Sequence, residues 1–214
     1  MSSSSLPEAA STANGGETTS SSSKDDQKPI VWLNNAGQAP LLPQVEQMGI
    51  QAILRPPWTP SPTSESSILD AIRENFASLI DCSDPSDIAI TPNTAYAISL
   101  AATNIQRELL KRGSTGGRII LIQDQFCSAV YPWQQLRDES NGAIQLEIVP
   151  YPDIYDTGGW TPAIMKRLED NDDVIAACLP PLHWSDGAII DLEVIGQACR
   201  KKNVPLIVDA TQGM

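Results

Sequence analysis

The 214-residue sequence lacks several features that mark common classes of protein. It holds a single histidine, His183, and its four cysteines show no C-x-x-C spacing, which argues against a zinc site and predicts no bound metal. No apolar run reaches the length of a membrane span, so we predict no membrane association. No G-x-G-x-x-G follows a predicted strand and no P-loop occurs, which makes a Rossmann-type nucleotide-binding protein a poor alternative.

Positive charge is also scarce, because 14 lysines and arginines stand against 26 aspartates and glutamates, a formal net charge of −12. Long polyanions need concentrated lysine and arginine, so we predict that nucleic acid is not a partner. A small anionic ligand is still compatible with this charge, because backbone N–H groups are able to hold it.

Residues 1–28 are rich in serine and threonine and poor in apolar side chains, a composition that predicts a disordered tail. The tail lacks an apolar signal core, and it is acidic without arginine, unlike a mitochondrial presequence. Scattered cysteines are typical of a reducing compartment, so we predict a cytoplasmic protein. The remaining residues, 29–214, are long enough for one domain.

Apolar patterning in residues 29–214 alternates between strands and helices. The predicted strands are a short first segment at 29–33 and then 88–90, 118–122, 143–149, 174–178 and 205–209. The predicted helices are 43–54, 64–80, 94–112, 130–138, 161–170 and 191–203. Repeated strand–helix units with continuous apolar strands predict an α/β fold, in which a mostly parallel sheet carries helices on both faces as a three-layer structure.

In open sheets of this kind, ligands bind beyond the carboxyl ends of the strands. Four of the predicted strands end in loops that carry small, polar or aromatic residues, namely "TPNTAYAI", "QDQFCSAVYPW", "LPPLHWSDG" and "DATQGM". The candidate site residues come from these loops.

Three of these loops carry residues with both a functional and a structural interpretation. Asn93 is placed to cap a helix, and the unpaired N–H groups beyond it, with the Thr94 hydroxyl, suit a phosphate; a capping role alone is the alternative. Phe126 offers an aromatic face to a planar ring, although core packing is the more usual role of a phenylalanine. His183, with Trp184 beside it, is more often structural than catalytic in such a setting.

Asp209 directly follows the apolar run "PLIV", where a buried carboxylate is costly unless its charge is paired or hydrogen-bonded. Hydrogen bonds from a neighbouring backbone cap are one way to stabilise this carboxylate. A cationic ring nitrogen of a ligand is a better partner, because each ion then offsets the desolvation of the other. Gln212 lies three residues further on and is able to donate to an oxygen of the same ligand. A phosphate, a flat ring and a pyridinium nitrogen together describe pyridoxal 5′-phosphate.

The segment "LPPLHWSDGAIIDLEVIGQACRKKNVPLIVDATQGM" resembles the class V aminotransferase family of pyridoxal-phosphate enzymes, which includes cysteine desulfurases and epimerase-like members. "WLNNAGQAP", "TPNTAYAISLAA" and "FCSAVYPWQQL" follow the family's order, so the similarity covers about residues 31–214. The resemblance implies the large domain of a fold-type I enzyme.

The resemblance also implies roles for individual residues. Asp209 would keep the pyridine nitrogen protonated, and Gln212 would hydrogen-bond the phenolic oxygen of the ring. Thr94, with the amide of Ala95, would bind the phosphate. Phe126 would stack on the ring. Asn35 and Asp186 lie in loops that border the substrate in relatives, so the resemblance implies a place beside the substrate for both.

The Schiff-base lysine of the family has no counterpart among the lysines present, which are Lys24, Lys28, Lys111, Lys166, Lys201 and Lys202. The resemblance therefore implies that residues 29–214 are a partial large domain, truncated before that lysine and inactive as this chain. The complete enzyme would act at the Cα of an amino acid through an aldimine, as a homodimer. Transamination, desulfuration, epimerisation and lyase chemistry all remain open. The alternative is a non-catalytic paralogue that binds the cofactor or dimerises.

Overall fold

The structure is a computed structural model that describes residues 31–33, 39–60, 65–114, 116–153 and 158–213. The chain divides into two units, residues 1–40 and 41–214, and all helices and strands of the described residues belong to the second unit. The predicted disordered tail, residues 1–28, and the predicted substrate residue Asn35 lie outside the described residues. Both therefore stay predictions.

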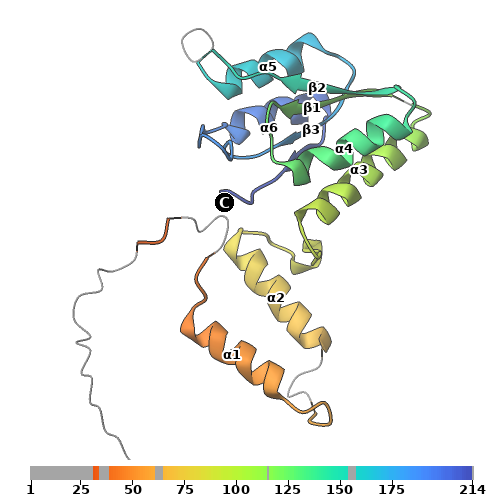
Figure 1. The fold of residues 1–214 in the computed structure, drawn as a ribbon. Helices are drawn as coiled ribbons and strands as arrows, with labels where there is room; N and C mark the ends of the chain where they lie inside the picture. Colours follow the sequence, from red (N-terminus) through yellow and green to blue (C-terminus); the bar gives the residue numbers. More distant parts are fainter. Residues whose placement is uncertain (1–30, 34–38, 61–64, 115, 154–157, 214) are drawn as a thin grey trace, which may run out of the picture. The chain divides into compact units, whose positions relative to one another are not determined.

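From α3 onward, the second unit alternates helices and strands in the order that the apolar patterning predicts (Figure 1). Its elements are α1 (Pro43–Leu54), α2 (Glu65–Leu79), a short 3-10 helix η1 (Pro85–Asp87), α3 (Thr94–Lys111), β1 (Gly117–Ile122), α4 (Cys127–Glu139), β2 (Ile144–Val149), α5 (Trp160–Asp170), β3 (Val174–Leu179), α6 (Leu192–Lys202) and β4 (Leu206–Val208). Helix α4 begins three residues before its predicted start, so Pro132 lies inside the helix instead of in its first turn. Pro132 is buried there, and it donates no helical hydrogen bond because proline has no amide hydrogen.

The described strands form one sheet in the order β2-β1-β3-β4, and all three pairings are parallel. Strands β1 and β2 pair over their full lengths, from Gly117 opposite Ile144 to Ile122 opposite Val149. Because the strands are parallel, their carboxyl ends share one edge of the sheet. The mostly parallel sheet of the prediction is confirmed.

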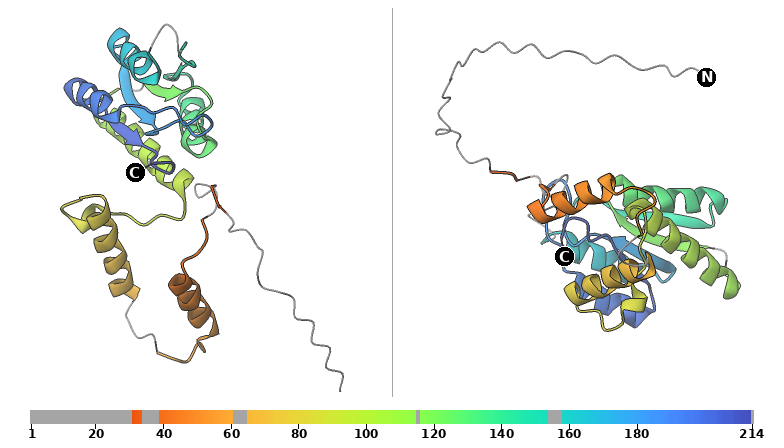
Figure 2. Two further views of the ribbon diagram at one scale, coloured as in Figure 1. Left: turned by 90° about the vertical axis from the view of Figure 1, so that its left-hand side faces the viewer. Right: turned by 90° about the horizontal axis from the view of Figure 1, so that it is seen from below.

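Helices cover both faces of this sheet (Figures 1 and 2), as the three-layer prediction requires. On one face, α5 and α6 pack through Trp160, Ile164 and Ile195 on alternate residues of the strands. On the other face, α3 and α4 pack through Ile98 and Trp133 on the intervening residues. This two-sided burial explains why the strands read as continuous apolar runs.

Two short strands predicted near the start of the chain, 29–33 and 88–90, are not present in the described residues, which leave out residues 29 and 30. Residues 31–33 carry no strand, and residues 88–90 form an extended connection between η1 and α3. The backbone of Ile88 is satisfied locally, because its amide donates to the carbonyl of Pro85 and its carbonyl accepts from Nε of Arg73 at 3.1 Å. A strand needs a neighbour, and no strand in the described part of the chain pairs with either segment.

Helices α1 and α2 keep their large apolar side chains exposed, while the small Ala77 of α2 is buried. On α2, the face predicted from sequence carries Ile68, Ile72, Phe76 and Leu79, which are 40–68% exposed. On α1, no residue is buried. Among the described residues, none of the helices combines the length and the apolar character needed to cross a membrane.

Candidate functional site

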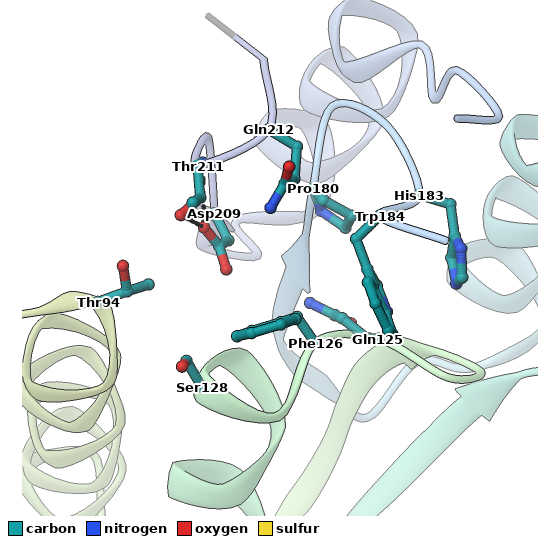
Figure 3. Close-up of a pocket in the computed structure, with 10 residues that line it drawn as sticks. All are labelled: Thr94, Gln125, Phe126, Ser128, Pro180, His183, Trp184, Asp209, Thr211 and Gln212. Atoms are coloured by element: carbon teal, nitrogen blue, oxygen red, sulfur yellow. Dashed lines mark hydrogen bonds between the residues drawn. The ribbon is translucent and has the colours of Figure 1, made fainter. Parts of the chain in front are cut away.

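A cavity lies at the edge of the sheet where the strands end (Figure 3). Its lining comes from all four loops singled out in the sequence: Thr94 at the start of α3; Gln125, Phe126 and Ser128 after β1; Pro180, His183 and Trp184 after β3; and Asp209, Thr211 and Gln212 after β4. The structure therefore gathers residues more than 100 positions apart around one space, which is the arrangement expected of a ligand site in an open α/β sheet.

The N-terminus of α3 faces this cavity and offers hydrogen-bond donors that no described protein group uses. The side-chain oxygen of Asn93 accepts the amide of Tyr96 at 2.9 Å, which caps the helix as predicted. Within the described residues, no protein acceptor binds the amides of Thr94 and Ala95 or the hydroxyl of Thr94. Thr94 itself lines the cavity, while Ala95 follows it in the first turn. Free amides at the positive end of an 18-residue helix suit an anion.

Asp209 continues the ladder of β4 and then turns its side chain into the cavity. Its amide donates to the carbonyl of Leu179 at 3.1 Å, and the residue is only 8% exposed. One carboxylate oxygen accepts the hydroxyl and the amide of Thr211. In the described part of the chain the other oxygen has no partner, and Figure 3 shows it directed toward the space beside Phe126. This oxygen is available to a cationic donor of a ligand.

Phe126 and Trp184 form an aromatic corner opposite Thr94 (Figure 3). Their ring centroids lie 5.5 Å apart and the ring planes meet at 83°. Phe126 is 42% exposed and is therefore not the core residue of the structural alternative. Gln212 lies on the side of Asp209, and its side-chain amide has no protein partner among the described residues. The cavity is thus polar at one end and aromatic at the other.

Sequence reasoning missed four lining residues, namely Gln125, Ser128, Pro180 and Thr211. Gln125 is buried, where its side-chain oxygen accepts the amide of Ile122 at 3.2 Å and its nitrogen donates to the carbonyl of Cys178 at 3.1 Å. These bonds tie the loop after β1 to strand β3. The position of Gln125 between a strand end and Phe126 was the only available signal, and it does not distinguish a buried clamp from an ordinary loop glutamine.

His183 is fully buried, in agreement with its structural interpretation, and it also lines the cavity. Asp186 accepts the amide of Ala188 at 2.8 Å, and its carboxylate lies 3.6 Å from Nδ1 of His183. Asp186 is exposed and is not among the residues that line the cavity. Its predicted place beside a substrate stays a prediction.

The lysines that the structure describes lie away from this cavity. Lys111 ends α3 and pairs with Glu108 at 2.6 Å. Lys166 lies in α5, and Lys202 in α6 donates to the carbonyl of Leu168. Neither lysine nor arginine occurs among the described lining residues, so Asp209 has no positively charged side chain beside it there.

Comparison with known proteins gives one family and a set of solved structures of the same fold. The model of the aminotransferase class-V family matches residues 62–214. An uncharacterized aminotransferase, YcbU of Bacillus subtilis, is 26% identical over 141 residues, which are 65% of this chain and 33% of that protein. The cysteine desulfurase IscS of Shewanella halifaxensis is 24% identical over 190 residues, which are 85% of this chain and 44% of that protein.

Two solved structures illustrate the shared fold. A NifS-like protein superposes with a TM-score of 0.65 at 18% identity, over 84% of this chain and 48% of that chain. A K223A mutant of C-DES, which holds glycine covalently linked to its pyridoxal-phosphate cofactor, superposes with a TM-score of 0.57 at 17% identity, over 78% of this chain and 42% of that chain. The present chain spans between a third and a half of the length of the curated relatives that it matches.

Proposed function

This chain belongs to the aminotransferase class-V family, and on that premise we propose that its cavity binds pyridoxal 5′-phosphate. The observation that carries the proposal is the carboxylate of Asp209, which is 8% exposed and keeps one oxygen without a protein partner in the described residues. A buried carboxylate is stabilised by a cationic partner. The protonated ring nitrogen of the cofactor is such a partner, and no lysine or arginine of the described lining competes for the place.

The other lining residues fit the remaining parts of the same ligand. The amides of Thr94 and Ala95 and the hydroxyl of Thr94 would hold the phosphate at the start of α3, so that an acidic protein would bind it without a lysine. The exposed face of Phe126 would pack on the ring, and the amide of Gln212 would donate to its phenolic oxygen. Each group of the ligand then meets a residue type suited to it.

When bound, the cofactor supplies an aldehyde that condenses with amines and a ring that withdraws electrons from the Cα of an amino acid. The residues of this chain contribute binding and electrostatics. Asp209 would hold the proton on the ring nitrogen, and Phe126 would shield one face of the ring from water. The substrate class that we propose is therefore an amino acid, in line with the glycine bound to the cofactor in C-DES.

The described lining offers no lysine, so the binding that we propose for these residues is noncovalent. This property also suits the second candidate function, a non-catalytic protein that binds the cofactor or dimerises. The exposed apolar side chains of α1 and α2, among them Met48, Ile53 and Leu79 at 68–84% exposure, favour a homodimer. Four free cysteines favour the cytoplasm as the compartment.

Equilibrium dialysis of the full chain against pyridoxamine 5′-phosphate tests the proposal. This probe carries an amine in place of the aldehyde, so it forms no Schiff base with surface lysines. We expect one binding site, weakened about tenfold or more by Asp209→Asn because a charge-assisted hydrogen bond is lost. The same substitution at Asp170, which is exposed at the end of α5, serves as the matched control and should leave binding unchanged. Undiminished binding by the Asp209→Asn chain would place the ligand elsewhere.

A further inference from the structure

The loop after β3 holds the loop after β1 through two consecutive side chains. Nε2 of His183 lies 3.0 Å from the carbonyl oxygen of Gln123. Nε1 of Trp184 donates to the carbonyl oxygen of Asp124 at 2.7 Å. Two neighbouring residues of one loop therefore bond two neighbouring carbonyls of the other, and the carbonyls lie two to three residues before Phe126. We call these two bonds the ring latch.

The His183 half of the ring latch is rigid. A carbonyl only accepts hydrogen bonds, so Nε2 carries the proton, and Nδ1 is left to accept from the Ser185 hydroxyl at 3.0 Å. The imidazole is fully buried. It stacks on the Trp160 ring, with centroids 5.4 Å apart and planes 9° apart, and it lies edge-on to the Tyr151 ring, with centroids 5.2 Å apart. A ring enclosed on several sides in this way cannot leave its carbonyl without repacking.

The segment that receives the ring latch needs such support. Asp124 has φ of 52°, in the left-handed region that residues other than glycine rarely adopt. The next residue, Gln125, is clamped between Ile122 and Cys178 by its buried amide. Phe126 is the N-cap of α4, and its side chain has no polar atom with which a hydrogen bond could orient the ring. The direction of its ring therefore depends on what holds the preceding turn and on the ring of Trp184 beside it.

We propose that His183 and Trp184 are positioning residues for Phe126. Through the ring latch they fix the backbone before Phe126, and through the edge-to-face contact Trp184 fixes the ring itself, at 5.5 Å and 83°. A flat ligand then meets a preset aromatic corner and does not have to order it on binding, which is a gain in affinity. This inference rests on the proposed function only for its ligand, because the ring latch itself is present without one.

The sequence offers a direct way to observe the ring, since Phe76 and Phe126 are its only two phenylalanines. Selective labelling of phenylalanine in the full chain gives NMR signals from both residues, and Phe126→Leu assigns them. We expect the Phe126 ring signals to be displaced by the ring current of Trp184. Trp184→Phe, which keeps an aromatic ring but removes the Nε1 donor, should return the Phe126 signals toward the Phe76 position. The third set of signals, from the phenylalanine introduced at position 184, is assigned by comparison with the chain that carries both Trp184→Phe and Phe126→Leu. Phe76, on α2, is the internal control.

Binding of pyridoxamine 5′-phosphate provides the second readout. Trp184→Phe should weaken binding about fivefold in the native background, the size of one hydrogen bond or one aromatic pair. In the Phe126→Leu background it should weaken binding less than twofold, because the residue through which Trp184 acts is gone. His183→Gln, which retains an amide donor, should bind more tightly than His183→Leu. Removing a buried ring endangers folding, so Trp184→Phe carries the test.

The outcomes separate the two proposals. An unchanged Phe126 signal in the Trp184→Phe chain overturns the positioning role, whatever the ligand does. An equal loss of affinity in both backgrounds also overturns it, since Trp184 would then act on the ligand independently of Phe126. If the native chain binds no pyridoxamine phosphate, the proposed function fails, and the Phe126 signal alone decides whether the ring latch positions the ring.

Discussion

Asp209 accepts two hydrogen bonds from Thr211 through one carboxylate oxygen, at 2.5 Å from the hydroxyl and at 3.2 Å from the backbone amide. This local turn orients the carboxylate and uses only one of its oxygens. The second oxygen faces the cavity, where among the described lining residues it meets no positively charged side chain. The described protein groups therefore hydrogen-bond only one of the two carboxylate oxygens of Asp209, and this has measurable consequences.

Replacing Asp209 with Asn should leave the free energy of unfolding unchanged or raise it by about 1 kcal/mol in the absence of ligand. Asparagine keeps an oxygen for the Thr211 hydroxyl and removes a buried charge that lacks a cationic partner. Urea denaturation of the two chains measures this difference. A loss of several kcal/mol would show that the charge itself stabilises the fold.

Ligand should stabilise the native chain more than the Asp209→Asn chain, because the substitution weakens binding about tenfold. At a free concentration a hundred times its dissociation constant, pyridoxamine phosphate raises the free energy of unfolding by about 2.7 kcal/mol. Thermal denaturation with and without the ligand detects this shift. An equal shift in both chains would contradict a contact between the ligand and Asp209.

Thr94→Val should weaken binding of pyridoxamine 5′-phosphate about fivefold, because it removes one hydroxyl donor at the start of α3. Binding of pyridoxamine, which has no phosphate, should not change. Thr103→Val is the matched control, since Thr103 is an exposed threonine of the same helix. A parallel loss for both ligands would mean that Thr94 contacts the ring instead of the phosphate.

The buried thiol of Cys178 should resist alkylation at pH 8 while the exposed Cys127 reacts. Burial raises the pKa of Cys178 from 9.0 to about 12, chiefly through desolvation of the thiolate, and the negative charge of Asp209 adds to the rise. Mass spectrometry after a short treatment with iodoacetamide locates the label. Labelling of Cys178 at the rate of Cys127 would contradict this environment.

The same shift predicts how stability depends on pH. The folded state holds the Cys178 proton more tightly than the unfolded state, so its contribution is complete below pH 9 and is lost as the pH rises toward 12. The Cys178→Ala chain should lose less stability than the native chain over that interval. Urea denaturation at several pH values makes the comparison, and identical slopes for the two chains would contradict it.

Asp191→Ala should lower the free energy of unfolding by about 1 kcal/mol, because Asp191 caps α6. Its carboxylate accepts the amides of Glu193 at 3.1 Å and Val194 at 3.0 Å. Asp170→Ala, at the exposed end of α5, removes the same charge without a cap and is the control. Equal effects of the two substitutions would show that the cap contributes nothing specific.

Much of the fold follows from local pattern. The alternation of apolar runs and amphipathic segments predicts the bounds of α1, α3 and β1 to within one residue, because side-chain periodicity and Pro43 at the helix start are properties of neighbouring residues. The predicted strand at 88–90 is wrong for the complementary reason. Whether three apolar residues form a strand depends on a partner elsewhere in the chain, and here Arg73 and Pro85 satisfy Ile88 instead.

By itself, the sequence placed Phe126, Asp209 and Gln212 at the carboxyl edge of a parallel sheet, because each follows a strand that the structure contains. Its placing of Thr94 there rested on the strand at 88–90, which does not form, and the structure brings Thr94 to the cavity through the start of α3. Only the tertiary structure decided how they are held. The contact of Trp184 with Phe126 and the bond from His183 to Gln123 join residues 58 and 60 positions apart. Such contacts depend on strand order and on how two loops pack, and neither quantity is encoded in the periodicity of any one segment.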